Sequence, residues 1–157
     1  MHLVPEDRAA QALIPGWSVR ANATLALVRR FFTRIGLERK RTNELIRDLD
    51  VASAGPEAPI ESLSGGNQQK VVVGRWLLKP ARVLALDEPF RGVDLGARAD
   101  IAAKIREQDG AVIVASADVD EVLEVADRIV VLSHGAVVRD VPAASADREA
   151  LTLAMNA

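Results

Sequence analysis

The sequence predicts an α/β protein whose core is a mostly parallel β-sheet. Three short apolar runs, at residues 83–86, 111–115 and 129–132, are separated by segments in which apolar residues recur with helical spacing. Strands that are apolar throughout are typical of sheets buried on both faces, and strands that alternate with helices favour parallel pairing. The chain has 157 residues, of which 49% are hydrophobic, so it is long and apolar enough to bury a core as one domain.

The first third of the chain is predicted to be largely helical and rich in charge. Ser18 is a suitable N-cap, and Pro5 ends the first strand. The predicted elements are, in order, a strand at 2–4, a turn at 14–16, a helix from 18 to about 32, a basic stretch at 34–41, a short helix at 42–49 and a loop at 50–61.

The rest of the chain alternates helices with the apolar runs. Pro80 ends the first of these helices, Asp118 caps a later one, and a turn around His134 joins the last two strands. The predicted elements are helices at 67–78, 96–108, 118–126 and 147–155, and strands at 83–86, 111–115, 129–132 and 136–138.

Composition excludes several classes of protein. The net charge is −2 and aromatic residues make up 3% of the chain, which disfavours nucleic-acid binding. The absence of cysteine excludes disulfide scaffolds and cysteine metal sites. No apolar run approaches the roughly 20 residues of a membrane-spanning helix, and the first eight residues lack the pattern of a secretory signal.

Two adjacent carboxylates, Asp87 and Glu88, end the apolar run at 83–86. Ligands of parallel sheets bind beyond the carboxyl ends of the strands, so these side chains are expected at the ligand edge. One carboxylate can hold Mg²⁺ together with substrate phosphates, and the other can orient or deprotonate an attacking water. Taken alone, this motif fits a surface turn that happens to carry two acidic residues equally well.

A second candidate site begins the helix predicted at 67–78. Ser64, Gly65 and Gly66 precede it, and two glycines at a helix start allow an anion to approach exposed backbone N–H groups. Ser64 adds a hydroxyl donor. Taken alone, the triplet also fits a simply capped helix, which is the commoner meaning of such a sequence.

Together these motifs resemble those of the ATP-binding-cassette (ABC) ATPases. LSGGNQQK at 63–70 is similar to the family's signature motif, VLALDEP at 83–89 to its Walker B motif, and GVDLGAR at 92–98 to its D-loop. VPEDR at 4–8, GWSVRAN at 16–22 and DEPFRGVD at 87–94 extend the resemblance to the second nucleotide-binding half of bacterial sugar-importer ATPases of the ribose, xylose and galactose type. The resemblance covers essentially the whole chain.

The resemblance implies a fold, a domain organisation and partners. The fold would be a P-loop NTPase-like ABC core, and residues 1–157 would form part of one nucleotide-binding domain. Residues 16–62 would be a helical subdomain facing a transmembrane sugar permease, and residues 63–157 the remaining α/β part. A second ABC nucleotide-binding half would be the other partner, at the cytoplasmic face of the bacterial membrane. Trp17 is either an exposed anchor or, as we favour, packed inside the helical lobe.

The resemblance also implies roles for single residues toward ATP and Mg²⁺. Asp87 would hold Mg²⁺ through water, and Glu88 would be the general base. Residues assigned to ATP binding or to coupling between the two halves are Ser64, Gly65 and Gly66 (acting on ATP bound to the opposing half), Gln68, Asp94 at the dimer interface and Glu6 at the Q-loop position.

Two elements of the family's pattern are missing. No G-x-x-x-x-G-K-[ST] phosphate loop occurs anywhere, and Ala117 stands where the family carries a switch histidine. The sheet is therefore expected to lack strands, and the isolated chain to be inactive and to complement a partner's site in trans. Phe90 also stands where the family commonly carries threonine, directly after the DEP element at 87–89.

Several alternatives stay open from the sequence. The chain could be a non-catalytic interaction module or a degenerate remnant that docks on a permease or an ATPase partner. A chromosome or DNA-repair ATPase of the ABC type is disfavoured, because no sustained heptads occur. The transported sugar, and whether the chain is a natural short gene or a piece of a longer one, are not determined.

Overall fold

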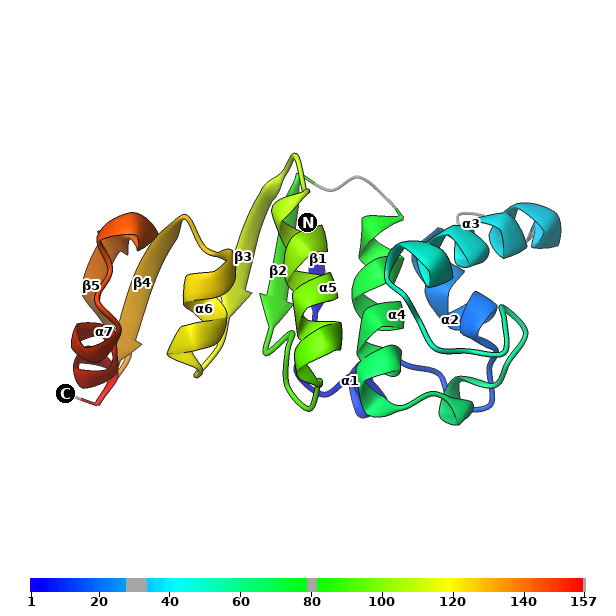
Figure 1. Ribbon diagram of the computed structural model, residues 1–157, viewed down its shortest axis with the longest axis horizontal. Helices are drawn as coiled ribbons and strands as arrows, with labels where there is room; N and C mark the ends of the chain where they lie inside the picture. Colours follow the sequence, from blue (N-terminus) through cyan, green and yellow to red (C-terminus); the bar gives the residue numbers. More distant parts are fainter. Residues whose placement is uncertain (28–33, 79–81, 157) are drawn as a thin grey trace.

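The computed structural model describes residues 1–27, 34–78 and 82–156. Its centre is a parallel sheet in the order β1 (His2–Val4), β2 (Val83–Asp87) and β3 (Ala111–Ala115). A separate antiparallel pair follows, β4 (Arg128–Ser133) and β5 (Ala136–Pro142). The strands line up along the long axis of the molecule, with the helical lobe at one end and β5 at the other (Figure 1).

The predicted strands are all present, but the last two leave the parallel sheet. Residues 129–132 lie in β4, which pairs only with β5 among the described strands. His134 and Gly135 form the hairpin turn with φ angles of 49° and 78°, a backbone conformation that suits such turns. The β3 and β4 strands, joined by a helix, do not hydrogen-bond to each other as a continuous parallel sheet would require.

Seven α-helices occur in the described part of the chain. They are α1 (Arg8–Gln11), α2 (Val19–Thr24), α3 (Ile35–Asp48), α4 (Gly65–Leu77), α5 (Leu95–Arg106), α6 (Val119–Val125) and α7 (Arg148–Met155), with 3₁₀ turns at Leu25–Leu27, Ile60–Ser62 and Ala143–Ser145. Most start at side-chain caps: Ser18, Ser64, Asp94, Asp118 and Asp147 each accept a hydrogen bond from the first turn of their helix.

The helical lobe corrects two predictions. The short helix predicted at 42–49 begins earlier, because residues 35–41 of the basic stretch form the first half of α3. Ion pairs of Arg20 with Glu38 and Glu57 tie α2 to α3 and to the following loop, which sequence periodicity does not reveal. The described part of the helix predicted from Ser18 consists of α2 and a 3₁₀ turn up to Leu27, and its predicted remainder to residue 32 lies outside the described residues.

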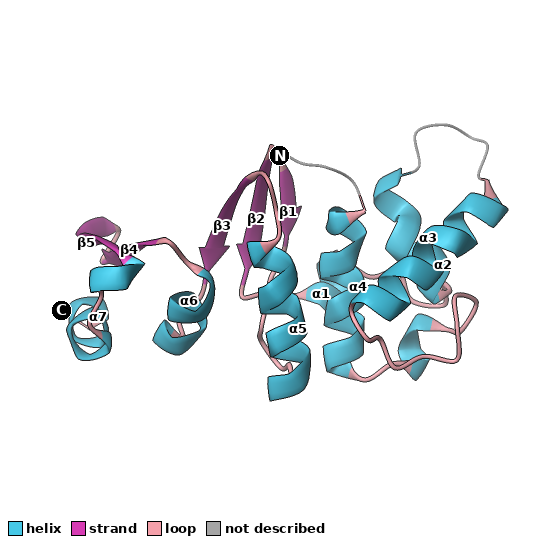
Figure 2. Cartoon of the chain, turned by 45° about the horizontal axis from the view of Figure 1, so that its top comes forward, coloured by secondary structure: helices cyan, strands magenta, loops and turns pink. Residues whose placement is uncertain are grey.

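Helix α4 lies between two hydrophobic cores. Its Val72 and Val73 pack with Leu84, Leu86 and other residues of the parallel sheet and α5. On its other side, Val71 packs into the helical lobe. Figure 2 shows α4 and α5 side by side below the sheet, with α2 and α3 beyond α4. The sheet and the helical lobe are therefore joined through one helix.

Close approach fixes the contact between α3 and α4. A Cβ on Gly74 would lie 2.6 Å from Leu45 Cδ1 and 2.8 Å from Leu49 Cδ1. Nearby, the buried Arg75 donates to the backbone oxygens of Asn22 and Ala12 at 2.7 Å each. Burial lowers the pKa of Arg75 to about 10. The lobe is thus held on the sheet by tight packing and by buried hydrogen bonds.

The exposure of Trp17 and the length of the described helices bear on two further sequence predictions. Trp17 is 45% exposed, so it is not packed inside the lobe as we favoured. It follows the Ile14–Gly16 turn, and its carbonyl accepts the Ile60 N–H at 3.0 Å, which holds it at the surface of the lobe. None of the described helices has the length and apolar character needed to cross a bilayer.

Candidate functional site

The turn after β2 places Glu88 at the carboxyl edge of the sheet. Glu88 has a φ angle of 46°, an unusual conformation for a residue other than glycine. Its backbone N–H still donates to the Ala115 carbonyl of β3 at 2.8 Å, so the turn is fixed to the neighbouring strand. Left-handed backbone at a non-glycine residue is frequent at functional sites, because the surrounding structure must hold it there.

Two donors from the segment after β3 orient the Glu88 carboxylate. The Ala117 N–H donates to Oε1 at 2.8 Å, and Ser116 Oγ lies 3.2 Å from Oε2. Ala117 has no polar side chain, but its backbone N–H contributes to the site all the same. The position expected to hold a switch histidine therefore contacts the candidate base through the main chain.

Ser116 also contacts a second carboxylate. Its Oγ lies 2.6 Å from Oε2 of the buried Glu121 and accepts the Asp118 N–H at 3.1 Å. A serine hydroxyl has one proton, so it donates to Glu88 or to Glu121 but not to both at once. Sequence reasoning missed Ser116 and Glu121, because neither belongs to a recognised motif and their meeting depends on the β3–α6 turn.

Glu88 faces an open pocket of about 710 Å³ that is mainly acidic. Two arginines are present, but Arg91 pairs with Glu6 and Arg148 pairs with Asp120. The lining residues are Glu6, Glu88, Arg91, Ala117, Asp118, Val119, Asp120, Glu121, Arg148 and Thr152. The pocket thus has no unpaired cation among its lining residues, and phosphates would need positive charge from elsewhere.

Asp87 is the candidate metal ligand. It is exposed at the end of β2, and the described residues give its carboxylate no hydrogen-bond or ion-pair partner. No group of three or more potential ligand side chains that could hold a metal occurs in the described ranges. Such a free carboxylate fits Mg²⁺, which is commonly bound by one or two protein carboxylates together with waters and substrate phosphates.

The signature segment forms the start of α4. Ser64 is its N-cap, and Ser64 Oγ accepts hydrogen bonds from the Asn67 backbone N–H at 3.4 Å and from Asn67 Nδ2 at 2.9 Å. Asn67 Oδ1 in turn accepts the Ala52 N–H at 2.8 Å. With its lone pairs used in this way, the exposed Ser64 hydroxyl has its own proton available for an outside acceptor.

Both signature glycines are in tight surroundings. A Cβ on Gly65 would lie 2.6 Å from Nη2 of Arg8, and a Cβ on Gly66 would lie 3.1 Å from Oδ2 of Asp94. Arg8 is anchored in turn by a hydrogen bond from Nη1 to the Arg91 carbonyl at 3.0 Å. A side chain at position 65 would require Arg8 to move, and one at position 66 would require a small shift of Asp94.

Asp94 lies beside the signature and caps α5. Its Oδ1 accepts the Ala97 N–H at 3.0 Å, and this backbone hydrogen bond is the main cause that lowers the pKa of Asp94. Asp94 is exposed, as is Leu95 next to it, which is 83% exposed. The D-loop candidate and the signature thus share one surface of the molecule.

The two glutamines of the signature have different surroundings. Gln68 Nε2 lies 3.3 Å from the carbonyls of Ile60 and Leu63, so its amide braces the loop before α4. Gln69, which sequence reasoning did not single out, is buried and donates to the Pro89 carbonyl at 2.9 Å. Gln69 therefore ties the signature helix to the turn that follows Glu88.

The structure gathers the predicted site residues into two groups. Glu88 and Glu6 line the acidic pocket at the carboxyl edge. Ser64, Gly65, Gly66 and Asp94 lie together at the start of α4 and α5 and are not among the residues that line this pocket. Arg8 and Arg91 connect the groups, because Arg8 contacts Gly65 and the Arg91 backbone while Arg91 pairs with Glu6.

Comparison with known families settles the membership. The profile of a family described as "ABC transporter" matches residues 2–91, more than half of the chain. The chain belongs to the ABC transporter family. The ABC signature and Walker B motifs proposed from the sequence both lie within the matched range.

Three curated relatives are named as import ATP-binding proteins. The ribose import ATP-binding protein RbsA of Chelativorans sp. (strain BNC1) is 42% identical over 156 residues, which is 95% of this chain and 31% of RbsA. The arabinose import ATP-binding protein AraG of Escherichia coli O157:H7 is 43% identical over 164 residues, 99% of this chain and 32% of AraG. AraG of Shigella boydii serotype 4 (strain Sb227) gives the same values. The chain spans about a third of the length of these relatives.

Solved ABC cassettes share the fold. The dimeric bacterial cassette MJ0796 superimposes with a TM-score of 0.77 at 25% identity, over 91% of this chain and 62% of the cassette. A post-hydrolysis dimer of MJ0796 with ADP and Pi gives a TM-score of 0.76 over 90% and 62%. The predicted fold class, a partial ABC core of mostly parallel sheet and helices, is confirmed.

Proposed function

We propose that this chain is part of the ATP-binding and ATP-hydrolysing component of a carbohydrate importer. The observation that carries the proposal is the carboxyl edge of β2, where the Ala117 N–H and the nearby Ser116 hydroxyl contact the Glu88 carboxylate next to the free carboxylate of Asp87. The 42–43% identity to ribose and arabinose import ATP-binding proteins supports the substrate class.

In this proposal, the two carboxylates at the sheet edge have separate roles. Asp87 holds Mg²⁺, directly or through water, and the ion would neutralise charge on the phosphates when bound. Glu88 accepts the proton of the attacking water. The Ala117 N–H fixes one Glu88 oxygen, and the other oxygen stays near Ser116 and open to the pocket. A general base must be held within hydrogen-bond reach of its water, which this arrangement favours.

The signature is proposed to act on ATP bound by an opposing ABC half. Ser64, Gly65 and Gly66 lie apart from the acidic pocket, and the start of α4 offers backbone N–H groups and a hydroxyl proton to an anion. Asp94 on the same surface would couple the two halves, and Glu6 would sense the nucleotide beside Glu88. The dimeric state of the MJ0796 cassette supports this reading.

The isolated chain is proposed to be inactive. Both arginines that line the Glu88 pocket are engaged by carboxylates, and the pocket also contains Asp118 and Glu121. A triphosphate placed there would meet net negative charge. The missing positive charge and backbone donors would come from a phosphate loop on a partner.

The helical part of the chain is proposed to face the permease. The helical lobe packs against one side of α4, and its Trp17 is 45% exposed. A transmembrane sugar permease bound there would place the chain peripherally at the cytoplasmic face of the bacterial membrane. Neither surface composition nor charge favours a nucleic-acid partner, since the net charge is −2.

The test combines the chain with a partner that contributes the rest of a cassette. We define the AraG remainder as the part of E. coli O157:H7 AraG that lies outside the region matched to this chain. Co-expressed with this chain, it should give ATP hydrolysis that neither polypeptide shows alone. Glu88→Gln should lower turnover roughly 10² to 10⁴-fold, the effect of losing a general base.

A matched acidic residue controls for charge. Glu149→Gln removes the same charge from the exposed start of α7, outside the Glu88 pocket, and should leave turnover unchanged. Equal turnover of the Glu88→Gln variant and the unmodified complex would overturn the assignment of the base.

A non-catalytic interaction module is the second candidate. The absence of an unpaired cation among the residues lining the Glu88 pocket favours it. It predicts a stable complex with the AraG remainder that binds ATP but hydrolyses none. Turnover that depends on Glu88 would exclude this alternative.

A further inference from the structure

We propose that Glu121 is a positioning residue for Glu88 and acts through the hydroxyl of Ser116. In this arrangement Glu121 takes the Ser116 proton, so Ser116 turns a lone pair toward Glu88 and leaves that carboxylate oxygen free for the attacking water. The consequence for hydrolysis rests on the proposed function, whereas the direction of the Ser116 hydroxyl rests on the structure alone.

The hydrogen-bonding capacity of Ser116 matches its three polar neighbours. A serine hydroxyl offers one proton and two lone pairs. One lone pair is used by the Asp118 backbone N–H, 3.1 Å away. The proton and the other lone pair are left for Glu121 Oε2 at 2.6 Å and Glu88 Oε2 at 3.2 Å. One carboxylate therefore receives the proton, and the other faces a lone pair.

The two distances assign the proton to Glu121. A hydroxyl that donates to a carboxylate lies about 2.5–2.7 Å from its acceptor, and the Ser116–Glu121 distance of 2.6 Å falls in that range. The Ser116–Glu88 distance of 3.2 Å is longer than the roughly 3.0 Å limit of ordinary hydroxyl hydrogen bonds. Glu88 is instead held through its Oε1, which accepts the Ala117 N–H at 2.8 Å.

Glu121 depends on the Ser116 hydroxyl more than Glu88 does. The Glu121 side chain is buried, and the described residues give its carboxylate no ion pair and no donor other than Ser116. A buried carboxylate without a hydrogen bond costs free energy, whereas Glu88 is only half-buried and faces the open acidic pocket. Turning the proton toward Glu88 would leave Glu121 without a donor, so that orientation is disfavoured.

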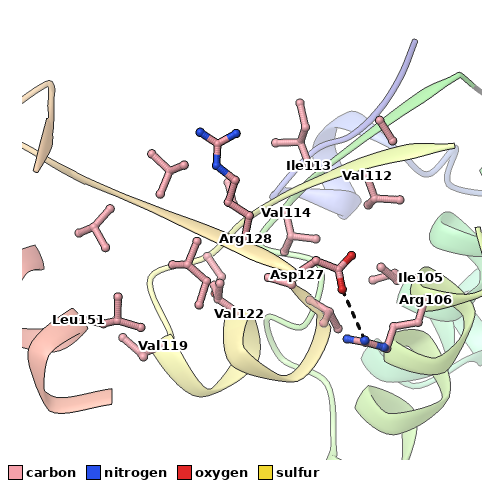
Figure 3. Close-up of a pocket in the computed structure, with 18 of the residues that line it drawn as sticks. Ile105, Arg106, Val112, Ile113, Val114, Val119, Val122, Asp127, Arg128 and Leu151 are labelled. Atoms are coloured by element: carbon pink, nitrogen blue, oxygen red, sulfur yellow. Dashed lines mark ion pairs between the residues drawn. The ribbon is translucent and has the colours of Figure 1, made fainter. Parts of the chain in front are cut away.

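Helix α6 holds Glu121 in place independently of Ser116. Figure 3 shows Val119 and Val122 of α6 among the apolar side chains that line a groove of about 860 Å³ between β3 and β4. Both valines pack against the core of β4 and α7. Glu121, from the same stretch of helix, lines the acidic pocket. The apolar contacts of α6 therefore set the position of its carboxylate beside Ser116.

Helix capping is the alternative role for Glu121. It is the third residue of α6 after the cap Asp118, and a glutamate at that place commonly accepts the backbone N–H of the cap residue. Here the Asp118 N–H donates to Ser116 Oγ, and Glu121 contacts Ser116 in turn. A cap does not require that hydroxyl to lie beside Glu88, so the two roles predict different results for hydrolysis.

The direction of the hydroxyl matters when Glu88 takes a proton. In the proposed reaction, one O–H bond of the water breaks and an O–H bond forms at Glu88 Oε2. The water oxygen bonds to the γ-phosphorus, and the bond from that phosphorus to the ADP oxygen breaks. The proton on Oε2 then faces the Ser116 lone pair and can donate to it. A Ser116 proton directed at Glu88 would instead compete with the water for Oε2.

Neutron diffraction from the deuterated 157-residue chain tests the hydroxyl direction without partner or nucleotide. Near neutral pH, the Ser116 deuterium should lie on the line to Glu121 Oε2, and Glu88 Oε2 should carry none. A Ser116 deuterium directed at Glu88, or a deuterium carried by Glu121 itself, would overturn the proposal.

Single and double variants in the complex with the AraG remainder test the effect on hydrolysis. Glu121→Gln keeps the shape of the side chain, but its amide can donate to Ser116 and release the hydroxyl proton toward Glu88. We expect kcat to fall about tenfold while KM for ATP stays unchanged. Because Glu121 acts through Ser116, adding Ser116→Ala should lower kcat little further. Effects that multiply in the double variant would overturn the proposal.

A second glutamate of α6 provides the matched control. Glu124→Gln removes the same charge from the helix, at a residue that pairs with Arg98 and does not line the acidic pocket. It should leave kcat unchanged, and equal loss of kcat in both variants would contradict the proposal. A capping role alone would lower the thermal stability of the Glu121→Gln chain without changing kcat of the folded complex.

The outcomes separate this proposal from the proposed function. Hydrolysis that depends on Glu88 but is unaffected by Glu121→Gln would overturn the positioning role and keep the proposed function. If the unmodified complex hydrolyses no ATP, the proposed function fails. The neutron result then decides by itself whether Glu121 holds the Ser116 proton.

Discussion

The two sides of the parallel sheet are packed to different degrees. On one side, α4 carries apolar residues into two cores, and Val71, Val72 and Val73 are all fully buried. On the other side, the unit of β4, β5 and α7 has a core centred on only three buried residues, and a groove separates it from β3. The start of α4 thus lies on the well-packed side, and Glu88 lies beside the open one.

This difference predicts which side of the sheet contributes less to the stability of the chain. Apolar surface that is covered within the chain stabilises the fold by itself. Apolar strands without neighbours leave both surface and backbone groups exposed, which costs stability until another segment covers them. The predictions below probe each side in turn.

The largest change in stability is expected from a substitution in the small core of β4, β5 and α7. Leu151 is 2% exposed, and Leu151→Ala should destabilise the C-terminal unit by about 2–5 kcal/mol. Because few contacts connect this unit to α4, amide exchange should rise in β4 and β5 and stay unchanged in α4. Leu153 on the same helix is 72% exposed, so Leu153→Ala is the control with little effect. Cooperative loss of protection in α4 would contradict the comparison.

The close contact between α3 and α4 should instead be sensitive to added side-chain volume. Gly74→Ala places a methyl group 2.6 Å from Leu45 and should destabilise the fold by about 1–3 kcal/mol, measured as the denaturation midpoint. Gly36→Ala is its control, since Gly36 lies in α3 with open space around it. That variant should stabilise slightly, by up to about 1 kcal/mol. A neutral Gly74→Ala would mean that the α3–α4 contact is loose.

The catalytic edge should depend moderately on Ser116. Ser116→Ala removes the hydroxyl near Glu88 and Glu121, so turnover with the AraG remainder should fall by up to about tenfold. Ser116→Thr keeps a hydroxyl and should restore most of the rate, which a merely structural role would not predict. Ser145→Ala, at an exposed serine outside the pocket, is the control.

The smallest expected effect is the dependence of folding stability on pH through Asp120. The hydrogen bond from Arg148 holds the pKa of Asp120 below its ordinary value of 3.8. A lowered carboxyl pKa stabilises the folded state above the ordinary value, and this contribution is lost as pH falls through the folded value. Both side chains are exposed, so the change in stability is small. Arg148→Gln should raise the pKa of Asp120 in an NMR titration, and an unchanged titration would contradict the assigned cause.

Much of the site was predictable because its signals are local. The carboxylates at 87 and 88 end an apolar run, and Ser64 caps the helix predicted to follow it. Strand positions and helix caps depend on neighbours within a few residues, which the sequence displays directly. The roles assigned to Glu6, Gln68 and Asp94 came from family resemblance and stay predictions.

The partners of these residues were not predictable. Ser116 meets Glu88 from 28 residues away, and Arg8 reaches the Arg91 backbone across 83 positions. Neither pair belongs to a repeating pattern, so no periodicity in the sequence marks it. The same holds for the basic stretch at 34–41, whose helix is held by ion pairs with α2 and the following loop.

The sequence by itself indicated the five strands, most of the helices, the apolar character of the strands and the two carboxylates that end β2. Periodicity, caps and turn residues act locally, so they are legible along the chain. Only the tertiary structure decided that β4 and β5 stand apart from β3, that Ser116 and Ala117 contact Glu88, and that a groove lies between β3 and β4, which do not pair with each other among the described strands. Those features depend on which distant segments of the chain meet, and no local pattern in the sequence shows that.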